Sequence, residues 1–277
     1  MMRIEAKVPE GGRSRYDRSG VRGRIHLPPM PKLHVNVDHI ATLRQARREW
    51  FPDPIAWALE AEKAGAAGIT CHLRKDRRHI QDEDVQRLRK SIATRLNLET
   101  SLDREILEIA RRVRPHAVCI VPEARNEVTT EGGLDVVTER RRLARAIPAL
   151  ADAGAEVSLF VDADLRQIRA VAALGAMFVE LHTGRYANAV GARKRRELAR
   201  LRTAAVFAHE HGLRVNAGHG LDYLNVGAVA ALPRVEELNI GFAIVARALE
   251  VGVHRAVGEM VAAARKNSTS RHAGVTR

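Results

Sequence analysis

Residues 53–74 read DPIAWALEAEKAGAAGITCHLR, and this stretch shows the local pattern that decides the fold. Asp53 is a favourable N-cap and Pro54 suits the first helical position, so the pattern predicts a helix over Pro54–Ala64. Gly65 can adopt the left-handed conformation that ends a helix. The short apolar run Gly68–His72 that follows is typical of a buried strand. The stretch therefore predicts a helix–strand unit of an alternating α/β fold.

The same unit recurs along the chain. Expected strands, all short and apolar, are Leu33–Asp38, Gly68–His72, Leu96–Glu99, Ala117–Val121, Glu156–Val161, Met177–His182, Leu213–Ala217 and Glu236–Ile240. Helices are expected over Pro54–Ala64, Asp82–Thr94, Asp103–Arg112, Thr138–Ala153, Leu165–Leu174 and Lys194–His211, with a last one after Phe242. Eight such units favour a single (βα)8 TIM barrel over residues 32–265. An open doubly wound sheet is the alternative that the periodicity allows.

Two basic segments flank the expected barrel. Residues 1–31 are rich in Gly, Arg, Ser and Pro, lack periodicity and predict a flexible N-terminal extension. Residues 266–277 predict a flexible C-terminal tail. The first 30 residues carry seven basic and three acidic side chains, and residues 265–277 carry four basic ones, which leaves +5 of the net charge of +13 for the body.

The charge distribution bears on the partners that we expect. A mildly basic body suits small anionic substrates as well as it suits RNA. Most of the excess charge is peripheral, so we expect no nucleic-acid partner; an RNA-associated protein that binds through its basic tails is the alternative. No segment resembles a signal peptide or a membrane span, so we expect a cytoplasmic protein without a membrane partner. Cys71 and Cys119 are expected to be buried, reduced thiols.

Six of the eight expected strands end in polar residues. Alternate residues of a strand face the same way, and a TIM barrel carries its active site at the C-terminal ends of its strands. These side chains are therefore expected to share one pocket. The pairs and single residues are Asn36 and Asp38, His72 and Arg74, Asn97 and Glu99, Glu180 and His182, Asn216, and Asn239.

The residue types indicate proton transfer and phosphate binding. His72, Glu99 and His219 are candidates for proton transfer, because the pKa of His or Glu can be tuned toward neutral pH. The glycines of Gly218-His219-Gly220 and Gly241 follow the last two strands, where backbone N–H groups of barrel enzymes often bind phosphate. Three further candidates for phosphate binding are Arg47, Arg74 and His79.

Several kinds of site are missing from the sequence. No lysine lies inside an expected strand, so an imine would have to use an amine of the substrate. The chain has no complete dinucleotide fingerprint, no P-loop and no His-Glu-x-x-His motif. We therefore expect no organic cofactor and no metal, although a zinc site assembled from scattered histidines stays open.

At these residues the sequence resembles the pyridoxine 5'-phosphate synthase family, over roughly residues 33–264. The matching segments are Asn36–Arg44, Gly68–Arg74, Asp76–Ile80, Asn97–Glu99, Val121–Glu123, Glu127–Asp135, Val215–Leu221 and Glu237–Gly241. The resemblance implies a (βα)8 barrel that assembles as a homo-octamer and needs no cofactor or metal. It also implies the condensation of 3-amino-2-oxopropyl phosphate with 1-deoxy-D-xylulose 5-phosphate to pyridoxine 5'-phosphate, phosphate and water.

The resemblance also implies a role for each site residue. His72 and Glu99 would accept protons, His219 would donate one, and Glu180 would stabilise the transition state. The amino ketone phosphate would be held by Asn36, Arg47, Gly220, Gly241 and Phe242. The deoxyxylulose phosphate would be held by Asp38, His39, Arg74, His79 and Thr129.

One position departs from the family that the sequence resembles. Family members have histidine where this chain has Phe242, so a phosphate contact there would have to use the backbone N–H. The loop over residues 122–135 is longer than a typical βα loop, and a lid is expected there. A different barrel enzyme that acts on a phosphorylated sugar is the nearest alternative.

Overall fold

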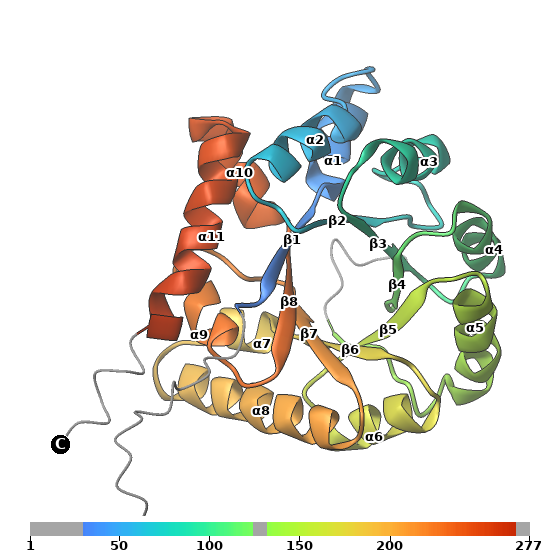
Figure 1. The fold of residues 1–277 in the computed structure, drawn as a ribbon, viewed down its shortest axis with the longest axis vertical. Coiled ribbons are helices and arrows are strands. Elements are labelled where there is room, and N and C mark those ends of the chain that lie inside the picture. Colours follow the sequence, from blue (N-terminus) through green and yellow to red (C-terminus); the bar gives the residue numbers. More distant parts are fainter. Residues whose placement is uncertain (1–29, 124–131, 270–277) are drawn as a thin grey trace, which may run out of the picture.

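Eight parallel strands close into a barrel in the computed structural model, which describes residues 30–123 and 132–269 (Figure 1). Each strand pairs with the next in sequence, and β1 pairs with β8 to close the barrel. The strands are β1 (Lys32–Asn36), β2 (Gly68–His72), β3 (Arg95–Thr100), β4 (Ala117–Ile120), β5 (Glu156–Val161), β6 (Phe178–His182), β7 (Arg214–Gly218) and β8 (Val235–Ile240). The prediction of a TIM barrel is confirmed.

The helices surround the barrel, as Figure 1 shows. They are α1 (Asp38–Arg47), α2 (Pro54–Lys63), α3 (Asp82–Ser91), α4 (Arg104–Val113), α5 (Arg140–Asp152), α6 (Leu165–Ala173), α7 (Gly184–Ala187), α8 (Gly191–Glu210), α9 (Val226–Ala230), α10 (Phe242–Val251) and α11 (Val253–Thr269). The sequence predicted α2 well: the Asp53 side chain accepts a hydrogen bond from the Ile55 N–H, and Pro54 opens the helix. The α11 helix continues to Thr269, beyond residue 265 where the predicted barrel domain ends.

The first strand is shorter than the sequence predicted. It ends at Asn36, and α1 begins at Asp38, where a strand was expected to continue. The Asn36 Oδ1 accepts a hydrogen bond from the Asp38 backbone N–H at 2.8 Å, a local bond that competes with strand pairing. Lys32, expected to precede the strand, is its first residue, but it is exposed at the N-terminal end of the barrel. No strand lysine therefore reaches the C-terminal end within the described residues.

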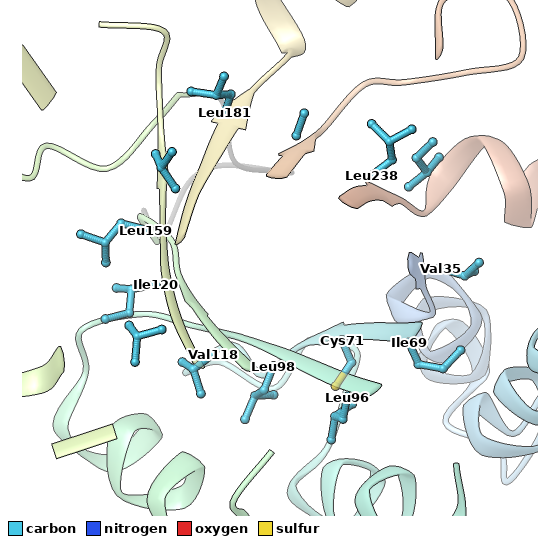
Figure 2. Close-up of a cluster of buried hydrophobic side chains, with 14 of the residues drawn as sticks. Val35, Ile69, Cys71, Leu96, Leu98, Val118, Ile120, Leu159, Leu181 and Leu238 are labelled. Carbon is cyan, nitrogen blue, oxygen red and sulfur yellow. The ribbon is translucent and has the colours of Figure 1, made fainter. Parts of the chain in front are cut away.

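The barrel wall separates an apolar layer from a polar interior. Residues such as Ile69, Leu98, Leu159, Leu181 and Leu238 lie between the strands and the helices and are fully buried (Figure 2). Each such side chain contributes about 1.5–3 kcal/mol of hydrophobic stabilisation. The alternate positions of the same strands face the interior, and many are polar: His34, Asn36, Thr70, His72, Asn97, Glu99, Ser158, Glu180, His182, Asn216, Glu237 and Asn239.

Both cysteines are free and fully buried, as predicted. Cys71 belongs to the apolar layer, whereas Cys119 packs with Val121 and Phe160 in a small separate cluster. Burial is the first cause that raises the pKa of both thiols well above the usual value. Residues 1–29, 124–131 and 270–277 lie outside the described residues, and with them most of the two predicted extensions.

Candidate active site

Asp38, His72 and Glu99 meet at the C-terminal end of the barrel. The His72 Nδ1 lies 3.9 Å from the Glu99 Oε2, and the Asp38 Oδ1 accepts a hydrogen bond from the His72 backbone N–H at 2.8 Å. β2 and β3 place His72 opposite Glu99 in register. The first turn of α1 supplies Asp38, whose other carboxylate oxygen accepts a hydrogen bond from the Asn36 Nδ2. The three groups therefore form a compact acid–base cluster.

Burial sets the protonation states in this cluster. The pKa of His72 is lowered to about 3, first by burial and then by His79 and Arg74, so its imidazole is neutral at physiological pH. The pKa of Glu99 is raised well above its usual value, first by burial and then by the charges of Asp38 and Glu180. The unliganded cluster thus contains a neutral imidazole beside a carboxyl group whose protonated form is favoured by burial.

The same three residues could hold a cation. One ligand-type atom from each of Asp38, His72 and Glu99 lies within 4.8 Å of the other two. Carboxylate oxygens and an imidazole nitrogen suit zinc or another divalent transition metal. They also suit an ammonium group, which carries hydrogen-bond donors and a positive charge. The geometry therefore admits a cation without specifying which one.

Glu180 lies at the centre of the barrel and is held by a polar network. Its Oε2 accepts a hydrogen bond from the Asn239 Nδ2 at 2.7 Å, and the Asn239 Oδ1 accepts one from the Thr70 hydroxyl at 2.8 Å. A Cβ atom at Gly218 would lie 2.5 Å from the Glu180 Oε1, so glycine makes room for the carboxyl group. The pKa of Glu180 is raised to about 7, first by burial. A carboxyl group whose pKa is near neutral pH can gain or lose its proton when charge develops in the site.

His219 follows β7 on a strained turn. Its φ of 81° lies in the left-handed region that few residues other than glycine adopt, and Gly220 follows with φ of 73°. The Thr183 hydroxyl donates to the carbonyl oxygens of Gly218 (2.7 Å) and His219 (2.5 Å) and holds this backbone in place. Observed strain of this kind is concentrated at functional sites. The pKa of His219 is lowered to about 4, first by burial and then by His182.

The candidate phosphate residues at and after the ends of β1 and β8 also come together. A Cβ atom at Gly241 would lie 3.0 Å from the Asn36 Cβ, so glycine lets the backbone approach Asn36 closely at this point. The rings of His39 and Phe242 stack edge to face with centroids 5.3 Å apart. Phe242 is mostly exposed and is the first residue of α10, whose backbone N–H groups can bind an anion. Asn36, His39, Gly241 and Phe242 therefore share one edge of the site.

The remaining predicted residues are placed less uniformly. Arg74 is buried, contacts Asp76 and lies 3.7 Å from Glu123, and its neighbour His79 has its ring centroid 6.2 Å from that of His72. Arg47 lies in the last turn of α1 and is exposed, so it is not among the buried side chains of the site. Thr129 lies outside the described residues.

The structure adds two acidic residues to those that we singled out. Glu123 follows β4 and accepts a hydrogen bond from the Lys75 backbone N–H as well as facing Arg74. Asp162 follows β5 and contacts His182 at the end of β6. The signal for both acids was present in the sequence, because each comes directly after an apolar strand run. We assigned no role to His182, although we expected it to face the same pocket as Glu180.

No helix in the described part of the chain is both long enough and apolar enough to cross a membrane.

Known structures resemble the chain in fold. A structure of the Amycolatopsis orientalis BexX/CysO complex matches with a TM-score of 0.59 and 15% identity over 89% of this chain and 93% of the other. A 3-hexulose-6-phosphate synthase matches with a TM-score of 0.58 and 17% identity over 84% and 99%. Phosphoribosylanthranilate isomerase from Thermotoga maritima matches with a TM-score of 0.52 and 13% identity over 85% and 99%. At these identities the likeness is one of fold.

A family model identifies the chain more closely. The model described as "Pyridoxal phosphate biosynthesis protein PdxJ" matches residues 33–266, which include every strand from Leu33 onward and the acid–base cluster described above. The chain belongs to the PdxJ family of pyridoxal phosphate biosynthesis proteins.

Proposed function

We propose that the chain condenses 3-amino-2-oxopropyl phosphate with 1-deoxy-D-xylulose 5-phosphate to give pyridoxine 5'-phosphate, phosphate and water. The observation that carries this proposal is the cluster of the buried Asp38 and His72 with the partly exposed Glu99, at the end of the barrel where TIM-barrel enzymes carry their active sites. Membership of the PdxJ family supplies the biosynthetic context. The cluster supplies groups that can accept and return protons during imine formation, elimination and ring closure.

The amino ketone explains why two carboxyl groups and a histidine are buried together. Its ammonium group would replace the missing countercharge between Asp38 and Glu99 and would lower the raised pKa of Glu99. Glu99 then becomes a carboxylate that can take a proton from the amine. His72, whose pKa of about 3 keeps it neutral, is in the unprotonated form that a proton acceptor needs, and a nearby anionic substrate would raise its basicity. Both residues therefore fit a role as proton acceptors in the loaded site.

His219 needs the substrate in order to act as the proton donor. With a pKa of about 4 it is neutral in the unliganded protein. A phosphate dianion or a developing oxyanion nearby would raise this pKa and favour the imidazolium form. Glu180, with its pKa near 7, would stabilise positive charge in the transition state when it is ionised. In this proposal each substrate supplies the charge that switches on one part of the catalytic machinery.

Binding of the two phosphates is assigned to two sets of residues. The amino ketone phosphate would lie against Asn36, Arg47, Gly220 and the N–H groups at Gly241 and Phe242. The deoxyxylulose phosphate would be held by Asp38, His39, Arg74, His79 and Thr129. Since the chain offers no buried lysine at this end of the described barrel, the amine that attacks the ketone comes from the substrate. We also propose that the chain assembles as a homo-octamer, which light scattering would test.

The experiment is a two-substrate assay with single-substrate controls. Wild-type protein is mixed with both substrates, and pyridoxine 5'-phosphate is followed by its absorbance. His219→Ala is the test variant, and His254→Ala, which alters an exposed histidine paired with Glu60, is the matched control. The proposal expects product from the wild type and from the control, and a loss of roughly 100-fold or more in His219→Ala. Absence of product from the folded wild type, or turnover of the sugar phosphate alone, would overturn it in favour of another barrel enzyme.

A further inference from the structure

Three side chains from neighbouring strands form a line that ends at His219. Asp162 directly follows β5, His182 ends β6, and His219 directly follows β7. The His182 Nδ1 lies 2.9 Å from the Asp162 Oδ1. The rings of His182 and His219 meet edge to face, with centroids 5.0 Å apart and an angle of 69° between their planes. A carboxylate and a buried imidazole thus stand behind the residue proposed as proton donor.

Asp162 fixes the tautomer of His182. The pKa of Asp162 is lowered, first by the hydrogen bond from His182, so the carboxyl group is ionised and accepts a hydrogen bond from the His182 Nδ1–H. The Arg185 Nη2 lies 3.4 Å from the other carboxylate oxygen, and the Gly133 backbone N–H also contacts the carboxylate. The neutral form of His182 therefore carries its lone pair on Nε2, which is where a second proton would bind.

The two imidazoles share a space that is shaped by glycine. A Cβ atom at Gly184 would lie 2.4 Å from the His182 Nε2 and 3.2 Å from the His219 Cδ2. Phe160 of β5 packs against both rings, with centroid distances of 5.2 Å to His182 and 6.3 Å to His219. The side chain of His182 is 4% exposed. The two rings therefore pack against each other and against Phe160.

The backbone joins the same two residues. Thr183, next to His182, donates its N–H and its hydroxyl to the Gly218 carbonyl and its hydroxyl also to the His219 carbonyl. These bonds hold the strained turn that presents His219. A change in the position of His182 would therefore be transmitted to His219 through the ring contact and through Thr183.

We propose that His182, held by Asp162, is a positioning residue that orients His219 and controls when the His219 imidazole carries a proton. The inference rests on the proposed function, in which His219 donates a proton. A protonated His182 repels a proton on His219, and this repulsion is the second cause, after burial, of the lowered pKa of His219. Within the described residues, the charged groups that face this pair are Asp162, directly after β5, and Arg185 of α7, which pairs with Asp162; Phe160 is uncharged. Binding of an anionic substrate would shift the proton toward His219.

The test is an NMR titration of the full chain with labelled histidine side chains. His182→Gln keeps a side chain that can donate to Asp162 but cannot be protonated. We expect the titration midpoint of His219 to move up by at most about one pH unit, because burial, the larger cause of its lowered pKa, remains, and kcat to fall by about tenfold or more with little change in KM. His254→Gln removes a similar histidine–carboxylate pair on α11, 2.7 Å from Glu60, and should change neither quantity.

The readouts separate this inference from the proposed function. An unchanged His219 midpoint in folded His182→Gln would overturn the inference even if the wild type makes product. If His182→Gln does not fold, the wild type alone gives the answer, because two interacting imidazoles titrate as a coupled pair. Two independent single-site curves for His182 and His219 would then overturn the inference, whereas mutual shifts would support it. Failure of the wild type to make product would bear on the proposed function alone.

Discussion

The barrel interior contains two largely buried histidine–glutamate pairs, one toward each end. The His72 and Glu99 side chains lie 3.9 Å apart at the C-terminal end, and the His34 Nε2 lies 3.7 Å from the Glu237 Oε1 deeper in the barrel, toward its N-terminal end. In both pairs burial is the first cause that lowers the pKa of the histidine and raises that of the glutamate. Residue type and pKa direction alone do not distinguish the two pairs.

Their surroundings do distinguish them. The first pair, the mouth pair, has Asp38 within 4.8 Å of both partners and lies at the strand ends where the loops converge. The second pair, which we call the inner pair, is enclosed. His34 is fully buried and packs so closely on Gly68 that a Cβ atom at Gly68 would lie 2.6 Å from the His34 ring. The Asn216 Nδ2 donates to Glu237 at 3.1 Å. A perturbed pKa therefore marks a catalytic group only where substrate can reach it.

The largest expected difference between the pairs is in catalysis. His72→Gln removes a neutral base from the mouth pair, and we expect kcat for pyridoxine 5'-phosphate formation to fall by about a thousandfold. Steady-state kinetics with both substrates would measure the loss. His34→Gln, the same change in the inner pair, should leave kcat within about threefold of the wild-type value, because His34 cannot touch substrate. Similar losses of kcat in both variants would contradict the distinction between the mouth pair and the inner pair.

A divalent cation is expected to bind at the mouth pair, and this is the second expected difference between the two pairs. Zinc is expected to inhibit by occupying the space between Asp38, His72 and Glu99, in competition with the amino ketone. Since the raised pKa of Glu99 means that a proton must leave before metal binds, inhibition should strengthen as pH rises. Glu99→Gln should weaken zinc binding by about tenfold or more, measured by calorimetry without substrate. Equal zinc affinity in Glu99→Gln and in the wild type would contradict this placement.

The inner pair should affect the free energy of unfolding rather than catalysis. His34 has a pKa of about 4 when folded and an ordinary value near 6.5 when unfolded, so between these pH values the unfolded chain binds the extra proton. Stability due to His34 is thus fully present above pH 6.5 and is lost as pH falls toward 4, by up to about 3 kcal/mol. Urea unfolding at pH 7 and 4.5 should show a smaller loss for His34→Gln than for the wild type. The exposed His254→Gln serves as a control; a loss in His34→Gln as large as in the wild type would argue against a buried neutral His34.

The smallest expected effect concerns Phe242, at the rim of the mouth. Because this ring is mostly exposed and contacts His39 at its edge, Phe242→His should change the free energy of unfolding by no more than about 0.5 kcal/mol. An added imidazole could reach the phosphate of the amino ketone, so its KM should fall a few-fold while that of the sugar phosphate stays constant. An unchanged KM for both substrates would indicate that the backbone N–H groups of α10 suffice.

Much of this site could be predicted from the sequence, because strand periodicity and barrel geometry place alternate residues in the interior. His72, Glu99 and Glu180 were found in this way. The helix at Asp38 was missed, because the local bond from Asn36 that ends the strand cannot be seen in a hydrophobic pattern. The inner pair was missed for a different reason. Polar residues inside strands resemble those at strand ends until the register of the strands is known. The contact between Asp162 and His182 depends on that register as well.

The most direct test of the account compares one change at each end of the barrel interior. Glu99→Gln and Glu237→Gln each replace a buried carboxyl group whose pKa is raised by burial with an amide of nearly the same shape. The measurement is kcat for pyridoxine 5'-phosphate formation by the two variants beside the wild type. The account predicts a loss of about a thousandfold for Glu99→Gln and a change of less than about threefold for Glu237→Gln. Full activity in Glu99→Gln, or an equal loss in folded Glu237→Gln, would contradict it.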